Sequence, residues 1–201
     1  MVPGMDELRS KLKHLAVLVV LAGAAFQACR PATAGGKRVT PSREAELSKF
    51  RAGMVQPESL SGGAKSRDAL VSRFVQALET RDTAALVAMH MTRAEFAWFY
   101  YPTNPQAQPP YNLSPDLMWF MEHGNSERGV QRLLDARAGR RLDVVGYRCD
   151  PVTSRQGDNT VIGPCVLRRA TANRDTTEER LFGLILERGG RFKFVSYANK
   201  L

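Results

Sequence analysis

Hydrophobic residues are concentrated in the last third of the chain, where the strand-like segments Glu179–Glu187 and Phe192–Asn199 flank Arg188-Gly-Gly-Arg191. A Gly-Gly pair between two such segments predicts a tight hairpin with positive φ at both glycines. The turn then places Ile185 opposite Phe194. One face is expected to carry Phe182, Leu184, Leu186, Val195 and Tyr197, and the other Leu181, Ile185, Phe192 and Phe194. Because both faces are apolar, we expect a sheet that is covered on both sides.

Two further segments, Arg141–Cys149 and Asn159–Thr171, have strand character and are joined by a loop of turn-forming residues. If this loop centres on its glycine, Cys149 lies opposite Cys165. Cross-strand neighbours have Cβ atoms close enough for a disulfide bond, so we predict a bridge here, with two buried free thiols as the alternative. Pro164 indicates an edge strand or a bulge. The cysteines are expected to share a face with Val145, Tyr147, Val161 and Leu167.

The segments before these strands have helical periodicity. Ser66 is the expected N-cap of a helix over Ser66–Thr80, and Asp82 is the expected N-cap of a short helix over Thr83–His90. A capping-box motif then predicts a helix over Ala94–Tyr101. That last segment is aromatic enough to form a strand instead. The first helix is expected to bury Leu70, Phe74, Ala77 and Leu78.

The proline-rich segment Pro102–Leu113 predicts a long loop, and such loops often border a site. Ser114-Pro115 is an N-cap followed by proline at the first helical position, which predicts a helix over Asp116–Glu122. The sequence His123-Gly-Asn125 is expected to end it, and a further helix is expected over Ser126–Ala138. The apolar residues expected to point inward are Leu117, Phe120, Met121, Val130, Leu133 and Leu134.

The first 34 residues have the features of an export signal. Basic residues precede the apolar segment Leu15–Phe26, which is short for a membrane-spanning helix. A retained membrane anchor is the alternative. The sequence Phe26-Gln-Ala-Cys29 resembles the lipobox of bacterial lipoproteins, which implies lipid attachment at Cys29. Its usual leucine is replaced by Phe26, and Ala32-Thr-Ala34 is a second possible cleavage site.

We therefore divide the chain into a signal peptide (1–28), a tether with a short helix over Ser42–Arg51 (29–65), and an α+β domain (66–201). Export to the periplasm or outer envelope would oxidise the remaining cysteine pair. Removal of residues 1–28 changes the net charge from +9 to +8. An exported basic protein has anionic envelope lipids or polymers, and not nucleic acid, as its electrostatic partners, although ordinary solvated basic side chains give the same composition.

The segment Ala69–Leu86 resembles the opening helix of NTF2-like (SnoaL-like) proteins, and Leu181–Tyr197 is similar to the closing hairpin of that fold. The middle of the chain departs from the family, because a proline-rich loop and helices replace its usual hairpin. The resemblance implies a cone-shaped α+β domain with a curved antiparallel sheet of four or more strands. It also implies an apolar pocket between sheet and helices. Family members include isomerases, cyclases and dehydratases, binding modules and dimerisation domains, so a homodimer is one expectation.

The sequence contains few candidates for catalytic or metal-binding residues. Only His90 and His123 remain once the signal is removed, and neither they nor the cysteines have metal-ligand spacing, so we expect no metal and no cofactor. His90 and Asp82 are the best acid–base candidates, unless they simply end and cap a helix. Tyr100, Tyr101 and Tyr111 are candidate proton donors. Together with Trp98 and Trp119 they form the core or line a pocket for an apolar ligand.

Two functions follow from these features. The first is a noncatalytic, lipid-anchored envelope protein whose domain binds a small apolar ligand or a protein partner. The second is a small-molecule acid–base enzyme of the SnoaL-like type. Because no convincing pair of titratable residues is visible, we expect the first.

Overall fold

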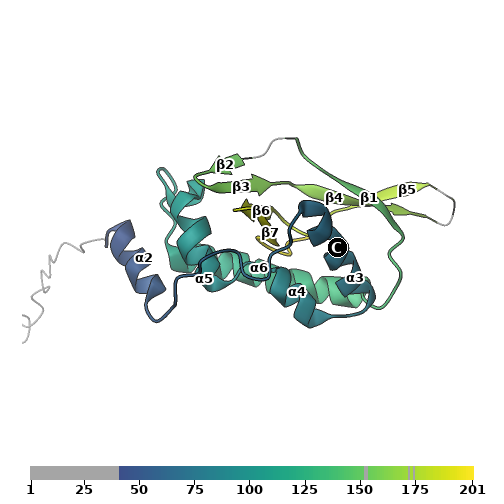
Figure 1. Cartoon of the computed structure of the whole chain (residues 1–201), viewed down its shortest axis with the longest axis horizontal. Helices are drawn as coiled ribbons and strands as arrows, with labels where there is room; N and C mark the ends of the chain where they lie inside the picture. Colours follow the sequence, from purple (N-terminus) through teal and green to yellow (C-terminus); the bar gives the residue numbers. More distant parts are fainter. Residues whose placement is uncertain (1–40, 152–153, 172, 174) are drawn as a thin grey trace, which may run out of the picture. The chain divides into compact units, whose positions relative to one another are not determined.

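The computed structural model of the chain describes residues 41–151, 154–171, 173 and 175–201. The predicted signal peptide, the lipid-attachment residue Cys29 and the second cleavage site after Ala34 lie outside these residues. Residues from Pro41 onward form one compact unit. This unit belongs to the predicted α+β class (Figure 1).

The α-helices in the described part are α2 (Arg43–Arg51), α3 (Arg67–Glu79), α4 (Thr83–Met89), α5 (Arg93–Glu95) and α6 (Pro115–Ala136). Short π and 3-10 turns follow α5, namely η2 (Phe96–Tyr100), η3 (Tyr101–Thr103) and η4 (Pro105–Ala107). The strands are β1 (Val144–Cys149), β2 (Ser154–Gln156), β3 (Asn159–Ile162), β4 (Cys165–Ala170), β5 (Thr176–Glu179), β6 (Ile185–Arg188) and β7 (Arg191–Phe194).

The predicted helix starts are confirmed by their caps. A side-chain oxygen accepts a hydrogen bond from the amide three residues later at Ser42, Ser66, Asp82 and Ser114. Thr92 and Glu95 form the predicted capping box. The segment after it is helical, so the alternative of a strand is wrong. Helical turns gather Phe96, Phe99 and Tyr100 into one buried cluster, whereas a strand would send alternate rings to opposite faces.

The largest departure from the prediction is α6, which is one continuous helix where we expected two. Gly124 does not end the helix, because glycine in a helix interior costs only about 1 kcal/mol relative to alanine. The predicted inward face of the first half is also wrong. The residues expected inside are exposed, at 45% for Leu117, 73% for Phe120 and 38% for Met121. The residues that are buried instead include Met118, Ser126, Gly129 and Leu133.

Small side chains on α6 explain this rotation, because they let the helix lie directly on the C-terminal segment. A Cβ atom at Gly129 would lie 1.9 Å from the Tyr197 carbonyl oxygen, which leaves room for glycine alone. The Ser126 hydroxyl accepts a hydrogen bond of 2.8 Å from the Tyr197 amide. Asn199 donates to the Gly129 carbonyl at 2.9 Å. The face of α6 that packs is therefore chosen by backbone contact as well as by apolar side chains.

The strands form two antiparallel sheets, β1-β4-β5 and β2-β3-β6-β7. The segment predicted as one strand over Asn159–Thr171 is divided at Gly163-Pro164, where the chain passes from one sheet to the other. In Figure 1 β3 and β4 follow one another in nearly one line. The predicted register is confirmed at Ile185↔Phe194 and at Cys149↔Cys165. Gly189 and Gly190 both have the positive φ that the hairpin requires.

The four-stranded sheet is covered on both faces, as predicted. Ile185 and Phe194 face a cluster formed with α3 and α4. Leu186 and Val195 face a second cluster formed with α2, η2 and the start of α6. Phe182 and Tyr197 were expected with this second cluster but belong to the first. The regular pairing of β6 with β7 ends at Ile185 and Phe194. Beyond these residues the side chains no longer alternate strictly between the two faces. Val145 is exposed instead of sharing the face of the cysteines, because a bulge shifts the register between Val144 and Gly146.

The described residues before Ser66, which we predicted to be a tether with a short helix, are part of the same compact unit as the strands. Phe50 of α2 lies edge-on to Phe96, with ring centroids 5.7 Å apart. Leu60 is fully buried, and Ala64 exchanges two backbone hydrogen bonds with Phe192. These contacts extend the β7 edge of the sheet and close the second cluster.

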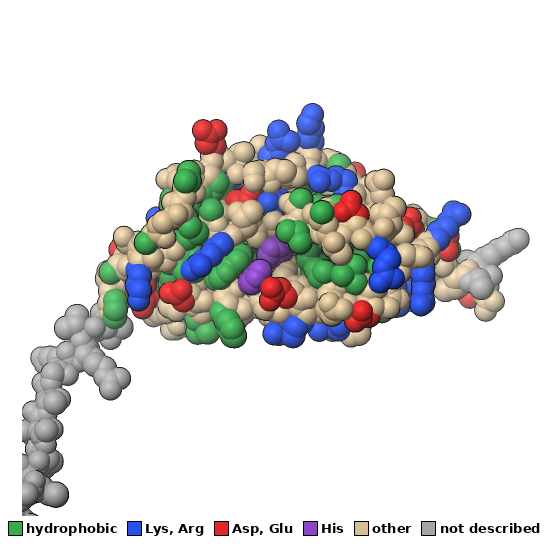
Figure 2. All heavy atoms as spheres, turned by 90° about the horizontal axis from the view of Figure 1, so that it is seen from below, with side chains coloured by type: hydrophobic (Ala, Val, Ile, Leu, Met, Phe, Trp, Pro, Cys, Tyr) green, Lys and Arg blue, Asp and Glu red, His purple; other side chains and the backbone are tan. Residues whose placement is uncertain are grey.

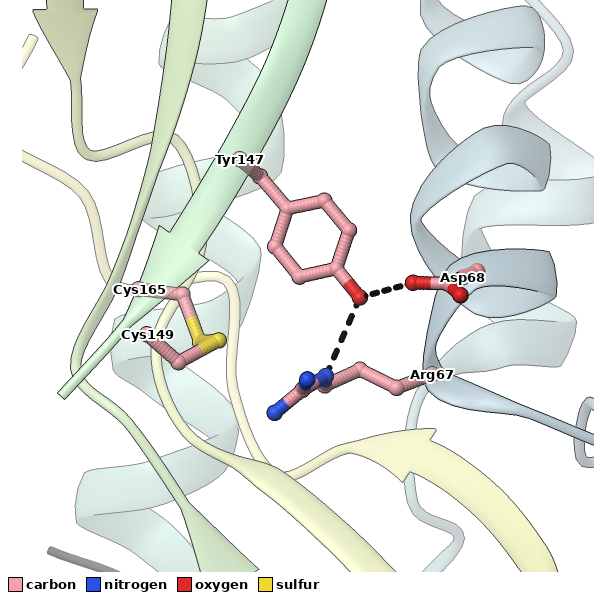
Figure 3. The surroundings of a disulfide bond; sticks show 5 residues. All are labelled: Arg67, Asp68, Tyr147, Cys149 and Cys165. Carbon is pink, nitrogen blue, oxygen red and sulfur yellow. Dashed lines mark hydrogen bonds between the residues drawn. A yellow bond between two sulfur atoms is a disulfide. The ribbon is translucent and has the colours of Figure 1, made fainter. Parts of the chain in front are cut away.

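The predicted disulfide joins Cys149 of β1 to Cys165 of β4, with Cα atoms 3.9 Å apart. Beside it, the Tyr147 hydroxyl contacts two residues at the start of α3, donating to Asp68 and accepting from Arg67 (Figure 3). The bridge therefore lies where the three-stranded sheet is tied to α3.

We expect reduction of this bond to lower the free energy of unfolding by about 3 kcal/mol, because the unfolded chain regains the entropy of a 16-residue loop. Denaturant unfolding with and without reductant measures the change. The Cys149→Ser/Cys165→Ser variant is the control, since its stability should not respond to reductant. Labelling of both thiols in denatured, unreduced protein would remove the bond from this account.

Candidate functional site

A groove of about 280 Å³ lies between α4, α6 and the segment after β7. Its lining comprises Val87, His90, His123, Ser126, Glu127, Val130, Gln131 and Tyr197, and we call it the His90 groove. Figure 2 shows the two histidines together on this face, with hydrophobic side chains on both sides of them. The groove combines apolar walls with a small number of polar groups, which is typical of small-ligand sites.

His90 is positioned by the sheet edge. It follows the last residue of α4 and forms a parallel bridge with Phe194, while the Met91 amide donates to the Phe194 carbonyl at 2.9 Å. Its ring lies 5.9 Å from the ring of Tyr197 and 6.4 Å from that of His123. The end of α4 and the edge of β7 together fix where the imidazole lies.

Burial, together with the nearby charge of His123, lowers the pKa of His90 to about 4. A hydrogen bond to the Val195 backbone opposes this shift. The ring is therefore neutral at pH 7. Its Nε2 atom is buried and has no hydrogen-bond partner among the described residues.

His123 lies at the mouth of the groove. Its ring stacks on Trp119 at 5.0 Å with an interplanar angle of 11°. Its Nε2 lies 3.3 Å from Glu127 Oε1, one helical turn further along α6. Both side chains of this pair are about half exposed or more, so solvent screens the interaction.

Tyr197 forms the floor of the groove with its ring. Its hydroxyl donates to the Leu86 carbonyl at 2.6 Å and is buried, and this burial raises the pKa of the phenol. Nearby, burial also raises the pKa of Glu122, against a hydrogen bond from Ser196. Burial and the Glu122 charge raise the pKa of Tyr100. Neither Glu122 nor Tyr100 lines the groove.

The structure separates most of the site residues predicted from the sequence. Asp82 is exposed and caps α4 at the end opposite His90, so the two do not form an acid–base pair. Tyr100 and Tyr101 are buried in the second cluster, and the Tyr101 hydroxyl donates to the Leu113 carbonyl at 2.9 Å. Tyr111 is 65% exposed.

Of the two tryptophans, Trp98 is covered by the guanidinium of Arg51, 4.9 Å from the ring centroid. Trp119 does not line the groove itself, but its ring stacks on that of His123, which does. The groove residues that were not predicted from the sequence are His123, Ser126, Glu127 and Val130. Their spacing along one helix is the signal that was available, and it was hidden because we expected the helix to end at His123.

We expect the neutral, buried His90 to make the protein sensitive to acid. The folded-state pKa is about 4 and the ordinary value is 6.5, so the unfolded chain binds a proton more readily between these limits. Stability from this group is full above pH 6.5 and is lost as the pH falls towards 4, by about 3 kcal/mol in total.

Denaturant unfolding of the wild type and the His90→Gln variant at several pH values measures this pH-dependent loss of stability. The variant should lack it, whereas other groups, including Glu122, contribute equally to both proteins. Parallel pH profiles of the two proteins would contradict the assignment to His90.

The described residues hold no cluster of three or more side chains suited to a metal ion. No helix in the described part of the chain has the length and apolar character needed to cross a bilayer. Comparison with protein-family models, curated proteins and solved structures finds no match.

Proposed function

We propose that this chain is an exported, lipid-anchored protein of the cell envelope, and that its NTF2-like domain is a noncatalytic module binding a small apolar ligand in the His90 groove. The observation that carries the ligand proposal is the groove itself, where the Tyr197 ring, Val87 and Val130 surround a neutral histidine. A cavity of about 280 Å³ suits a compact ligand such as a single substituted ring. The export and anchor part is supported by the sequence of residues 1–34.

The electrostatics of the groove favour binding over acid–base catalysis. A general base works best with a pKa near the operating pH, and the pKa of His90 is about 4. The groove also contains the pair His123 and Glu127, but this pair is exposed at the mouth of the groove. Neither arrangement supplies a poised base inside the cavity, so the alternative of an isomerase, cyclase or dehydratase has less support.

Chemical-shift mapping with 4-ethyltoluene tests ligand binding on the full-length chain. We expect shifts at His90, Val130 and Tyr197. Val87 is 71% exposed at the rim, so Val87→Trp should block the groove and weaken binding at least tenfold. Val55→Trp is the matched control, because Val55 is 86% exposed and does not line the groove. Equal binding by the two variants would contradict the site.

The anchor is tested separately by mass spectrometry of the mature N-terminus. A lipidated Cys29 is the expected result. A chain that begins at Gly35 would replace the anchored form with a soluble exported one. A chain that retains Met1 or Met5 would overturn export.

A second candidate function is a protein contact through the exposed face of α6 formed by Leu117, Phe120 and Met121. These three side chains are neighbours on one helix face and are apolar, which is typical of an interaction surface. A second copy of the chain is the partner that can be tested directly. Sedimentation velocity should show a dimer that Phe120→Glu dissociates and Val145→Glu, on an exposed strand position elsewhere, does not. A wild type that is monomeric at all concentrations would remove the homodimer.

A further inference from the structure

A second surface groove, of about 490 Å³, lies between α3 and β1 and shares no lining residue with the His90 groove. We call it the α3–β1 groove. One wall is residues 144–147 of β1. The α3 residues that form the other wall recur every three or four positions, which places them on one helix face over about three turns, a length of roughly 16 Å. They are Asp68, Val71, Ser72, Val75, Gln76 and Glu79.

Hydrogen bonds at both ends of the groove join the helix to the strand. At one end the Tyr147 hydroxyl donates to Asp68 at the start of α3 (Figure 3). At the other end the Glu79 carboxylate accepts a hydrogen bond of 2.7 Å from the amide of Leu142, just before β1. The helix and the strand therefore run antiparallel to one another, and the groove lies between these two contacts.

The main chain of β1 forms part of the groove wall. In the described part of the chain this strand has β4 as its one neighbour, so its other edge has no strand partner. Gly146 lines the groove although it has no side chain, so its main-chain atoms must do so. A Cβ atom at this position would meet no atom within 4 Å beyond its chain neighbours. The space beside the strand is therefore open to another extended segment.

The middle of the groove is apolar. Val75 and Val144 are half-buried there, and Val145 is 59% exposed. An unpaired strand edge beside exposed valine side chains is the combination on which proteins bind peptides by strand addition.

The ends of the groove are acidic. Asp68 and Glu79 are its charged lining residues, and neither forms a salt bridge with another described residue. Arg67 does not line the groove, and its guanidinium lies over the Tyr147 ring. The whole chain has a net charge of +9, so this negative charge is a local feature. A partner with a basic group at each end complements it.

We infer that the α3–β1 groove binds an extended peptide segment of a partner protein, which adds to β1 as a further strand. A strand rises about 3.3 Å per residue, so the groove accommodates roughly five residues. The segment that fits is apolar at its centre and has lysine or arginine at both ends. Main-chain hydrogen bonds to β1 supply affinity, and the carboxylates of Asp68 and Glu79 select the sequence. This inference does not depend on the ligand of the His90 groove.

The probe for this site is the peptide acetyl-Lys-Val-Thr-Val-Lys-amide, titrated into the full-length chain and followed by amide chemical shifts. We expect shifts at Val75, Val145 and Gly146 and none at His90. The same peptide with glutamate in place of both lysines should bind at least tenfold more weakly, because two ion pairs are replaced by repulsion. Equal binding of the two peptides would overturn the proposal.

The variant Asp68→Asn tests the charge, because asparagine keeps an oxygen that can accept from Tyr147. It should weaken binding of the lysine peptide about threefold, the effect of one exposed ion pair. Asp116→Asn is the matched control, since Asp116 also lies in the first turn of a helix and does not line the groove. Unchanged binding by Asp68→Asn, or an equal loss in both variants, would contradict the site.

Strand addition is tested by N-methylation of the peptide, which leaves the protein unaltered. Alternate N–H groups of a strand point to its neighbour. Of two lysine peptides, one N-methylated at threonine and one at both valines, we expect one to lose binding at least tenfold and the other to bind like the parent. Parent-like binding by both would exclude pairing with β1. Shifts at Val145 and Gly146 that depend on protein concentration alone would place a second copy in the groove and overturn the proposal.

Discussion

Replacement of Lys193 by methionine is expected to lower the free energy of unfolding by about 3–5 kcal/mol at pH 7. Lys193 and Glu95 are each 1% exposed and form an ion pair with contacts of 2.9 and 3.2 Å. The same carboxylate accepts hydrogen bonds of 2.7 Å from the amides of Ser61 and Thr92. Without the ammonium, a buried negative charge would keep these two backbone bonds but lose its counter-ion, and that uncompensated charge is the source of the penalty.

The double variant Lys193→Met/Glu95→Gln separates the charge from the packing. Its stability should recover most of the loss, because no unpaired charge remains and the glutamine oxygen can still accept a backbone hydrogen bond. Lys49→Met, at an exposed position of α2, is the matched control and should change the stability by less than about 0.5 kcal/mol. A double variant as unstable as the single one would show that lost packing, and not charge, is responsible.

The features that the sequence predicted correctly depend on local chemistry. The caps at Ser66, Asp82 and Ser114 each need only one side chain and the amides that follow it. The register of the last hairpin follows from Gly189-Gly190, because a two-residue turn leaves a single pairing. The disulfide was found by a different assumption, that the loop before β3 centres on Gly157, which places Cys149 opposite Cys165.

The features that the sequence did not predict depend on contacts between distant segments. Gly124 resembles a helix end, yet α6 continues because Ser126 and Gly129 fit against the backbone of Tyr197. That contact also rotates the helix and exposes Phe120. Local apolar spacing contains no information about a backbone approach of this kind.

The His90 groove was missed for the same reason. It forms only when α6 continues past His123 and carries His123 and Val130 to the end of α4. Of the aromatic residues that we expected in the core or in a pocket wall, Tyr100 and Tyr101 are buried in the second cluster and Trp98 packs against it partly buried. Tyr111 is exposed, and Trp119 stacks on His123 beside the groove.

The second large effect is expected for Phe74→Ala, which should lower the free energy of unfolding by about 3–5 kcal/mol. Phe74 is fully buried in α3. Its ring meets Phe182 at 5.2 Å and Phe194 at 5.4 Å, both edge-on, and stacks on Tyr197 at 5.9 Å. Truncation would remove contacts to β7 and to the floor of the His90 groove at once and would leave a cavity in the core.

Phe120→Ala is the matched control, because Phe120 is 73% exposed on α6. Its replacement should change the stability of the monomer by less than about 0.5 kcal/mol. Chemical denaturation of both variants measures the difference, and a Phe74→Ala midpoint close to that of the wild type would contradict the aromatic cluster. Because Tyr197 belongs to both the cluster and the groove, Phe74→Ala should also weaken 4-ethyltoluene binding even under conditions in which the variant remains folded. Phe120→Ala should not.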